Sequence, residues 1–105
     1  MDIKFEKKYL SNLYYTGQSG DKKHRFQPQI IRKYIRVIDL LRAASNIEEL
    51  YGFNSLNYEK LVGDKEGLES VRVNDKYRIE FKSRQEGTDI MVTICHILEL
   101  SNHYK

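Results

Sequence analysis

The sequence has little of what disulfides, metal centres and cofactor loops require. Its 105 residues include one cysteine, Cys95, so an intramolecular disulfide and a cysteine-rich zinc site are both excluded. No two of the three histidines lie three or four residues apart, the spacing that places two ligands on one face of a helix. The six glycines form no Gly-x-Gly or phosphate-loop motif. We therefore expect a protein that works without metal or cofactor.

Long apolar runs are also missing. Uninterrupted apolar stretches reach two or three residues, too few to cross a membrane. The first eight residues lack the apolar core of a signal peptide, and we expect a cytoplasmic protein. The length corresponds to one domain, residues 1–105. With 40% hydrophobic and 31% charged residues, the composition is that of a globular protein.

The first half of the chain has helical periodicity. A short helix is expected from about Lys7 to Tyr15, followed by a loop rich in glycine. Pro28, the one proline, suits the first turn of an amphipathic helix that we predict from Pro28 to Ala44. Ser45 or Asn46 can cap a short helical turn after it. Before these helices, residues 3–5 alternate like a short strand.

The second half has the period-two alternation of strands. We predict strands at residues 56–61, 68–73, 77–82 and 88–98, with a hairpin turn at residues 74–75. The last of them is apolar on both faces, which indicates a central strand. The fold class is therefore α+β, with N-terminal helices packed on a twisted antiparallel sheet in the order (β)ααβββ.

A motif in the second half resembles a known family. Residues 61–81 read LVGDKEGLESVRVNDKYRIEF. They are similar to the signature LKGD-x-G-x-W-S-V-x-V-N-x-W-R-I-x-F of HigB-like killer proteins, members of the RelE/ParE toxin superfamily. The upstream segments Tyr15-Thr16-Gly17 and Gln27-Pro28-Gln29 match the same group, so the resemblance extends from about Phe5 to Tyr104.

The resemblance implies a compact α+β toxin that cleaves mRNA on the translating ribosome. It also implies a cognate helix-turn-helix antitoxin of the HigA type. Two alternatives stay open, because one fold can carry unrelated functions. ParE-like relatives inhibit DNA gyrase without cutting RNA, and a degenerate toxin could bind its antitoxin and help it repress transcription.

RNA cleavage without a metal uses the ribose 2′-hydroxyl as the nucleophile. The site must supply a base, an acid and a cation for the charged phosphoryl oxygens. Arg78 matches the arginine of the family motif, and its forked guanidinium can engage two oxygens. Alternation with Tyr77 and Ile79 directs it away from the core. The alternative is an ordinary strand arginine that faces water.

Two further catalytic candidates depend on the resemblance. His103 aligns with the family's C-terminal Asp-Tyr-His ending, and histidine can move protons near neutral pH. Ser101 and Asn102 replace the Asp and Tyr, so Tyr104 is the candidate for stacking on a base. Each of these tail residues could instead belong to a poorly ordered chain end.

Lys60 is the third catalytic candidate. The family lysine that precedes the Gly-Asp pair is Val62 here, and Lys60 lies two residues earlier, where it could supply a similar charge. A solvated lysine is the alternative. In the last predicted strand, we expect His96 to be a hydrogen-bonded structural residue and Cys95 a buried thiol.

Positive charge is concentrated in residues 22–42. This segment holds seven Lys or Arg and one Asp, a net charge of +6, whereas the whole chain carries +3. It could contact ribosomal RNA phosphates or an acidic antitoxin, or form a solvated helix face. The residues that we predict to bind RNA or the ribosome are Lys22, Lys23, Arg25, Arg32, Lys33 and Arg36, together with Tyr104.

Overall fold

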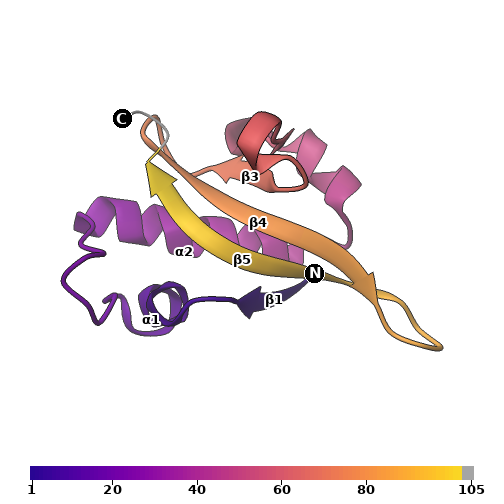
Figure 1. Ribbon diagram of the computed structural model, residues 1–105, viewed down its shortest axis with the longest axis horizontal. Helices are drawn as coiled ribbons and strands as arrows, with labels where there is room; N and C mark the ends of the chain where they lie inside the picture. The colour runs from indigo at the N-terminus through magenta and orange to yellow at the C-terminus, as the bar shows by residue number, and fades with distance from the viewer. Residues whose placement is uncertain (103–105) are drawn as a thin grey trace.

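Five strands form one mixed sheet in the order β1-β5-β4-β3-β2. Figure 1 labels four of them, β1, β5, β4 and β3. The structure is a computed structural model that describes residues 1–102. The strands are β1 (Asp2–Phe5), β2 (Glu59–Lys60), β3 (Glu69–Arg72), β4 (Tyr77–Glu86) and β5 (Val92–Asn102). Neighbours from β2 to β5 pair antiparallel, and β1 pairs parallel with β5. The α+β class is confirmed, with a parallel edge strand added to the predicted antiparallel sheet.

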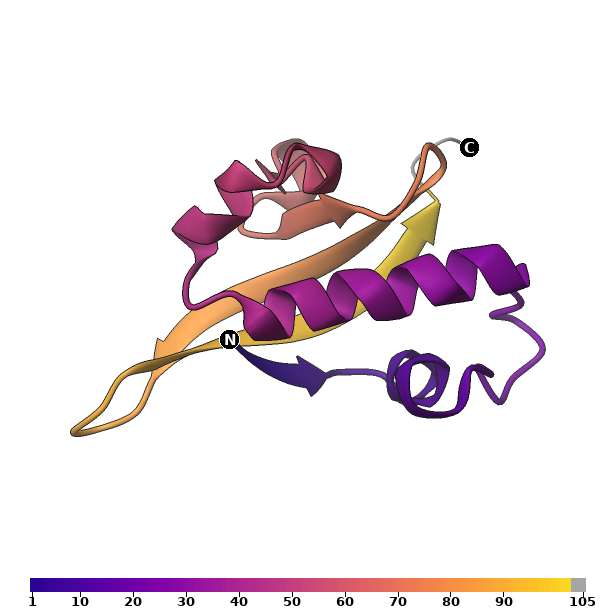
Figure 2. The same ribbon diagram turned by 180° about the vertical axis from the view of Figure 1, so that it is seen from behind.

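Two helices account for the first half, as predicted. Helix α1 (Lys8–Thr16) ends at Gly17, whose left-handed backbone (φ 76°) lets its N–H donate to Leu13. Helix α2 (Pro28–Ala43) begins with proline in its first turn. Figure 2 shows α2 running across one face of the sheet.

The core lies between α2 and the sheet. Tyr34 is fully buried, and its hydroxyl donates to the Leu10 carbonyl at 2.7 Å, which ties α2 to α1. Burying each large apolar side chain contributes about 1.5–3 kcal/mol, so this layer dominates the stability of the fold. Its other fully buried members include Leu13, Ile38, Leu41, Val71, Ile79, Phe81 and Ile97.

The predicted strand at residues 56–61 is mostly wrong. Asn54–Leu56 is a short 3-10 helix, η2, and strand β2 covers two residues. Asn57 takes a left-handed backbone (φ 42°), which interrupts the extended chain so that both Leu56 and Tyr58 become buried. Helix η1 (Ile47–Gly52) begins as predicted, because the Asn46 side chain accepts from the Glu49 N–H at 3.1 Å.

The last predicted strand, residues 88–98, is shifted along the chain. Strand β4 extends to Glu86, which pairs with Val92, and the chain turns between them. Ile90 and Met91 are therefore 78% and 54% exposed at the tip of a projecting hairpin (Figure 1). Strand β5 is internal to the sheet, as predicted, and Cys95 is buried on it, where burial raises the pKa of the thiol to about 12.

A short 3-10 helix, η3 (Gly63–Lys65), connects β2 to β3. Across residues 1–102, no helix is long and apolar enough to span a bilayer.

Candidate functional site

Arg78 lies on the sheet face that points away from α2. Its cross-strand partner is Arg72, and the next pair on the same face is Ser70 with Glu80. Paired residues project to the same side of a sheet, and the intervening Ile79 is fully buried on the other side. The alternation of β4 therefore places the guanidinium outside the core.

Arg78 lines a small cavity of about 150 Å³. Its side chain is 20% exposed, and its Nη2 atom lies 3.2 Å from Oε2 of Glu80. Among the described residues, the buried Nε atom of Arg78 has no hydrogen-bond partner. A buried N–H without a partner is costly, whereas the part of the guanidinium that lines the cavity is partly exposed. The other lining residues are Asn57, Glu59, Ser70, Arg72, Asn74, Asp75 and Tyr77.

Glu80 fixes the orientation of Arg78. The Glu80 side chain is 5% exposed, and its Oε2 atom accepts from Nζ of Lys65 at 2.6 Å. One buried carboxylate thus holds two cations, Lys65 from η3 and Arg78 from β4. This cluster retains a net positive charge beside the cavity.

A second cavity of about 620 Å³ lies on the other side of the β3–β4 turn. We call it the basic groove. It shares four lining residues with the cavity of Arg78: Arg72, Asn74, Asp75 and Tyr77. The start of α2 and the chain before it supply Arg25, Phe26, Gln27, Gln29, Ile30 and Lys33, and the turn adds Lys76. The fold therefore brings two predicted RNA-binding residues, Arg25 and Lys33, next to the cavity of Arg78.

The turn between these cavities is held by one side chain. Oδ1 of Asn74 accepts from the N–H groups of Lys76 and Tyr77 at 2.9 and 2.8 Å. The Val73 N–H donates to the Tyr77 carbonyl at 2.9 Å and closes the hairpin. The asparagine side chain thus replaces the glycine of an ideal hairpin turn.

Lys60 is not brought to Arg78. It pairs with Glu69, which pairs with buried Phe81, so Lys60 projects toward the opposite side of the sheet edge. It lines a separate cavity of about 490 Å³, whose other lining residues are Leu61, Glu66, Gly67, Leu68, Glu69 and Ser83. The neighbouring Glu59 lines the cavity of Arg78 instead. Adjacent residues of a strand project to opposite faces of the sheet, so Glu59 rather than Lys60 lies on the same face as Arg78.

The two candidates in the tail, His103 and Tyr104, lie outside the described residues. The chain that leads to them does pass the site. Ser101 pairs with Arg78, and Asn102, the last described residue, pairs with Tyr77.

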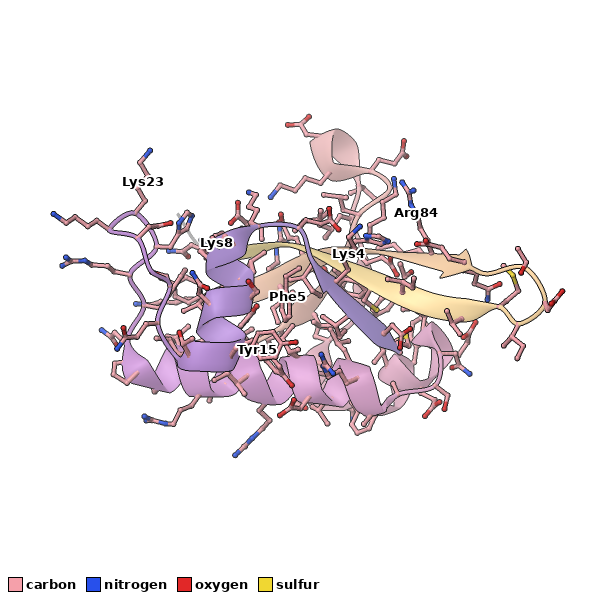
Figure 3. All side chains as sticks on the ribbon, turned by 90° about the horizontal axis from the view of Figure 1, so that it is seen from below. Lys4, Phe5, Lys8, Tyr15, Lys23 and Arg84 are labelled. Atoms are coloured by element: carbon pink, nitrogen blue, oxygen red, sulfur yellow. The ribbon has the colours of Figure 1, made fainter. Side chains whose placement is uncertain are left out.

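Four of the predicted RNA-binding cations line neither cavity of the site. Lys22, Lys23, Arg32 and Arg36 are exposed. Figure 3 shows Lys23 extending from the loop between α1 and α2. These side chains form a solvent-facing set that is distinct from the groove.

The sequence matches the family described as the RelE-like toxin of the HigB type II toxin–antitoxin system, over residues 3–93. The chain belongs to this family of HigB-like toxins. Toxin HigB-1 of Vibrio cholerae is 32% identical over 83 residues, which are 78% of this chain and 83% of the relative. A solved structure, the YoeB/ParE toxin from Agrobacterium tumefaciens, shares the fold at a TM-score of 0.59 and 17% identity. That alignment covers 99% of this chain and 100% of the neighbour.

As a type II toxin, this HigB-like protein has an antitoxin partner.

Its site contains lining residues that the sequence did not single out, namely Asn57, Glu59, Arg72, Lys76 and Tyr77. The predicted turn at residues 74–75 would pair Arg72 with Tyr77, whereas the observed turn is one residue longer and pairs Arg72 with Arg78. The contribution of Asn57 and Glu59 depends on the irregular chain before β3, which periodicity does not predict.

The two described histidines of the toxin lie outside both cavities. His96 bridges two carboxylates, with Nδ1 2.8 Å from Glu6 and Nε2 3.0 Å from Glu86. The hydrogen bond to Glu6, and to a smaller extent the one to Glu86, raises the pKa of His96 above its usual 6.5. His24 contacts Asp21 at 3.0 Å and stacks on Tyr9 at 3.6 Å between ring centroids. Over residues 1–102, no cluster of His, Cys, Asp and Glu is placed to hold a metal ion.

Proposed function

We propose that this HigB-like toxin is a ribosome-dependent endoribonuclease that cleaves mRNA by attack of a ribose 2′-hydroxyl. One observation carries the proposal. The guanidinium of Arg78 lines a small cavity, held by the buried carboxylate of Glu80, beside a groove lined by further cations. An RNA phosphate in the cavity would accept charge-assisted hydrogen bonds from this guanidinium.

The proposed step breaks one phosphodiester bond. The 2′-oxygen forms a bond to the adjacent phosphorus, and the bond from phosphorus to the 5′-oxygen of the next nucleotide breaks. The products are a 2′,3′-cyclic phosphate and a free 5′-hydroxyl. Negative charge grows on the non-bridging oxygens, where Arg78 donates charge-assisted hydrogen bonds. Glu80 holds the guanidinium in place for this role.

The step also moves two protons. A base takes the proton of the 2′-hydroxyl, and an acid gives one to the leaving 5′-oxygen. Glu59 is an exposed carboxylate that lines the cavity, with its Oε1 atom 3.3 Å from Nδ2 of Asn57, and it can accept the first proton. For the second proton, His103 stays the predicted donor, a role that rests on the family resemblance.

The ribosome would align the substrate and the toxin. The exposed set Lys22, Lys23, Arg32 and Arg36 suits contact with ribosomal RNA phosphates, which bind lysine and arginine without regard to sequence. We take the antitoxin to be a helix-turn-helix protein of the HigA type, and the site of action to be the cytoplasm, where mRNA is translated.

Mapping of mRNA 5′ ends after controlled expression tests the proposal. The wild type should arrest growth and produce cuts in phase with codons. Arg78→Ala should lower the cutting at least about 100-fold, the usual loss for a donor to a developing anion. Arg84→Ala is the matched control, since Arg84 is an exposed arginine of the same strand that lines neither cavity of the site.

Three outcomes would contradict the proposal. Cuts that persist in Arg78→Ala would remove Arg78 from the mechanism. Growth arrest with intact mRNA and DNA damage would favour the inhibition of gyrase. The absence of any arrest would favour a toxin that serves only as a co-repressor with its antitoxin.

A further inference from the structure

We propose that the basic groove is the subsite for the single-stranded RNA segment next to the cleaved bond. The inference rests on the proposed function, because the groove adjoins the cavity of Arg78. The inference assigns two different roles to the cations of the basic segment, residues 22–42. Arg25 and Lys33 would hold the substrate strand in the groove, while the solvent-facing cations contact other RNA.

Charge in the groove is strongly of one sign. Its lining includes four cations, Arg25, Lys33, Arg72 and Lys76, and one acid, Asp75. Asp75 is already paired with Arg72. Among residues 1–102, the other three cations form no ion pair within 4.0 Å. The groove therefore presents three uncompensated positive charges to an anion.

The start of α2 adds to this field. The helix has 16 residues, no acidic residue in its first turn and no side-chain cap. Pro28 has no N–H, and the Ile30 N–H donates to the Gln27 carbonyl at 2.9 Å, so the partial positive charge of this helix end is carried by the helix dipole and the Gln29 N–H. Gln27 and Gln29 of this helix end line the groove. Phosphates favour such a position, and here the cations of the groove reinforce it.

An aromatic ring lies at the junction of the two cavities. Tyr77 lines both of them and is half-buried. Phe26 holds it edge-on, with 5.6 Å between ring centroids and 77° between ring planes. Phe26 is in turn stacked near Tyr9 at 6.5 Å. An aromatic ring between two cavities that are both lined by cations matches the alternation of base and phosphate along a single strand.

The size of the groove also fits a ligand. Its volume of about 620 Å³ lies within the range of about 300–1,000 Å³ that is usual for ligand pockets. Because the groove and the cavity of Arg78 share the wall made by the β3–β4 turn, one continuous strand can occupy both. An acidic protein segment would satisfy the cations but would give Tyr77 no base to stack on.

Binding of a non-cleavable RNA to the purified toxin tests the inference. The probe is a labelled 2′-O-methyl oligoribonucleotide, which lacks the nucleophile, and fluorescence anisotropy is measured over a range of salt concentrations. The groove variant is Lys33→Gln with Lys76→Gln. The control is Lys8→Gln with Arg84→Gln, which removes the same charge from exposed residues outside the groove (Figure 3).

The groove variant should bind at least about 10-fold more weakly, with a shallower salt dependence. Each lost phosphate contact on a single strand lowers the slope of log K against log salt by about 0.7, so two should lower it by about 1.4. The control should bind within about threefold of the wild type. Circular dichroism checks that both variants are folded.

Three results would overturn the inference. Equal losses in both variants would mean that only net charge matters, and unchanged binding in the groove variant would remove the groove from RNA binding. Displacement of the RNA by a poly-glutamate peptide at lower concentration than by unlabelled RNA would assign the groove to an acidic protein. The proposed function fails separately, if ribosomes with the wild-type toxin show no cleavage while groove-dependent binding persists.

Discussion

Arg78 owes its position to the buried carboxylate of Glu80. That carboxylate lies 3.2 Å from the guanidinium and accepts a hydrogen bond of 2.6 Å from Lys65. Removing one partner of a buried pair leaves the other charge uncompensated, which is costly. Both cations are partly exposed, so water offsets part of that cost.

We expect Glu80→Gln to lower both activity and stability. The free energy of unfolding should fall by about 1–3 kcal/mol, less than for a fully buried pair because of the exposure of the cations. The cleavage rate should fall at least about 10-fold as Arg78 loses its orientation. Urea denaturation and ribosome cleavage assays measure the two effects. Glu66→Gln, at an exposed position, is the control, and wild-type cleavage by Glu80→Gln would contradict the role given to Glu80.

A second buried carboxylate supports the sheet on its other face. Glu69 accepts from the Tyr58 hydroxyl at 2.6 Å and from the Ser83 N–H at 2.7 Å. We expect Tyr58→Phe to lower the free energy of unfolding by about 1.5–3 kcal/mol, the usual contribution of a hydrogen bond to a charged group. Tyr51→Phe, at an exposed tyrosine, should have little effect in the same denaturation experiment. Equal stabilities would show that the Tyr58 contact contributes nothing.

At the residue scale, the sequence predicts which face of the sheet a side chain lies on better than it predicts which residues that side chain contacts. Alternation along β4 places Arg78 outside the core, as found. The pairing with Glu80 and Lys65 depends on where η3 returns to the sheet, which no local pattern encodes. The same holds for Lys60, whose strand phase is set by the left-handed residue Asn57.

The edge strand β1 is tied to the rest of the sheet by His96. Its ring contacts Glu6, just after β1, and Glu86, at the end of β4. The same sheet face carries Lys82, opposite His96 on β4, and Lys4, opposite it on β1. Arg84 also lies near enough to lower the pKa of Glu6. A protonated ring can donate to both carboxylates, whereas a neutral ring can donate to one.

This arrangement predicts a pH dependence of stability. The carboxylates raise the pKa of His96 in the folded state, so its contribution is complete below about pH 6.5 and is lost as pH rises through the higher folded pKa. The pKa of Glu6 is lowered mainly by His96, so its contribution is present above about pH 4.5 and is lost on acidification. The melting temperature of His96→Gln should therefore change less than that of the wild type between pH 6 and roughly pH 8. Parallel curves would contradict this account.

At the element scale, the two helices and strands β1 and β3 were predicted to within one residue at each end, whereas β4 extends four residues beyond its prediction and β5 is shifted. Helix α2 begins and ends within one residue of the prediction, because sixteen residues give several turns of amphipathic pattern. The predicted bounds of β5 were four residues too early, because the apolar residues near Ile90 and Met91 resemble a strand interior although they lie at a hairpin tip. The pairing of β4 with β5 decides where the turn falls, and that pairing is not visible in either strand alone.

For the whole molecule, the position of positive charge matters more than its total. The net charge is +3, yet the groove and the exposed cations of residues 22–42 gather positive charge around the start of α2. Part of this distribution was evident from the sequence. The contribution of Arg72 and Lys76 was not, because it requires the β3–β4 turn to fold against α2.

This distribution predicts how the toxin associates with ribosomes. Arg32→Gln with Arg36→Gln should weaken co-sedimentation with ribosomes and delay growth arrest, because both side chains are exposed on α2 and neither lines the groove. Lys8→Gln with Arg84→Gln removes the same charge elsewhere and should co-sediment like the wild type. Equal losses in the two double variants would mean that net charge alone drives association.

The central claim is that the toxin cleaves RNA through the 2′-hydroxyl of the substrate. The most direct measurement uses reconstituted ribosomes programmed with one mRNA, first all-ribose and then with a single 2′-deoxy nucleotide at the mapped cleavage position. We predict that the all-ribose mRNA gives a 2′,3′-cyclic phosphate and a 5′-hydroxyl end, and that the 2′-deoxy mRNA is not cut at that position. Cleavage of the 2′-deoxy mRNA at the same bond, or a product with a 5′-phosphate, would contradict the account.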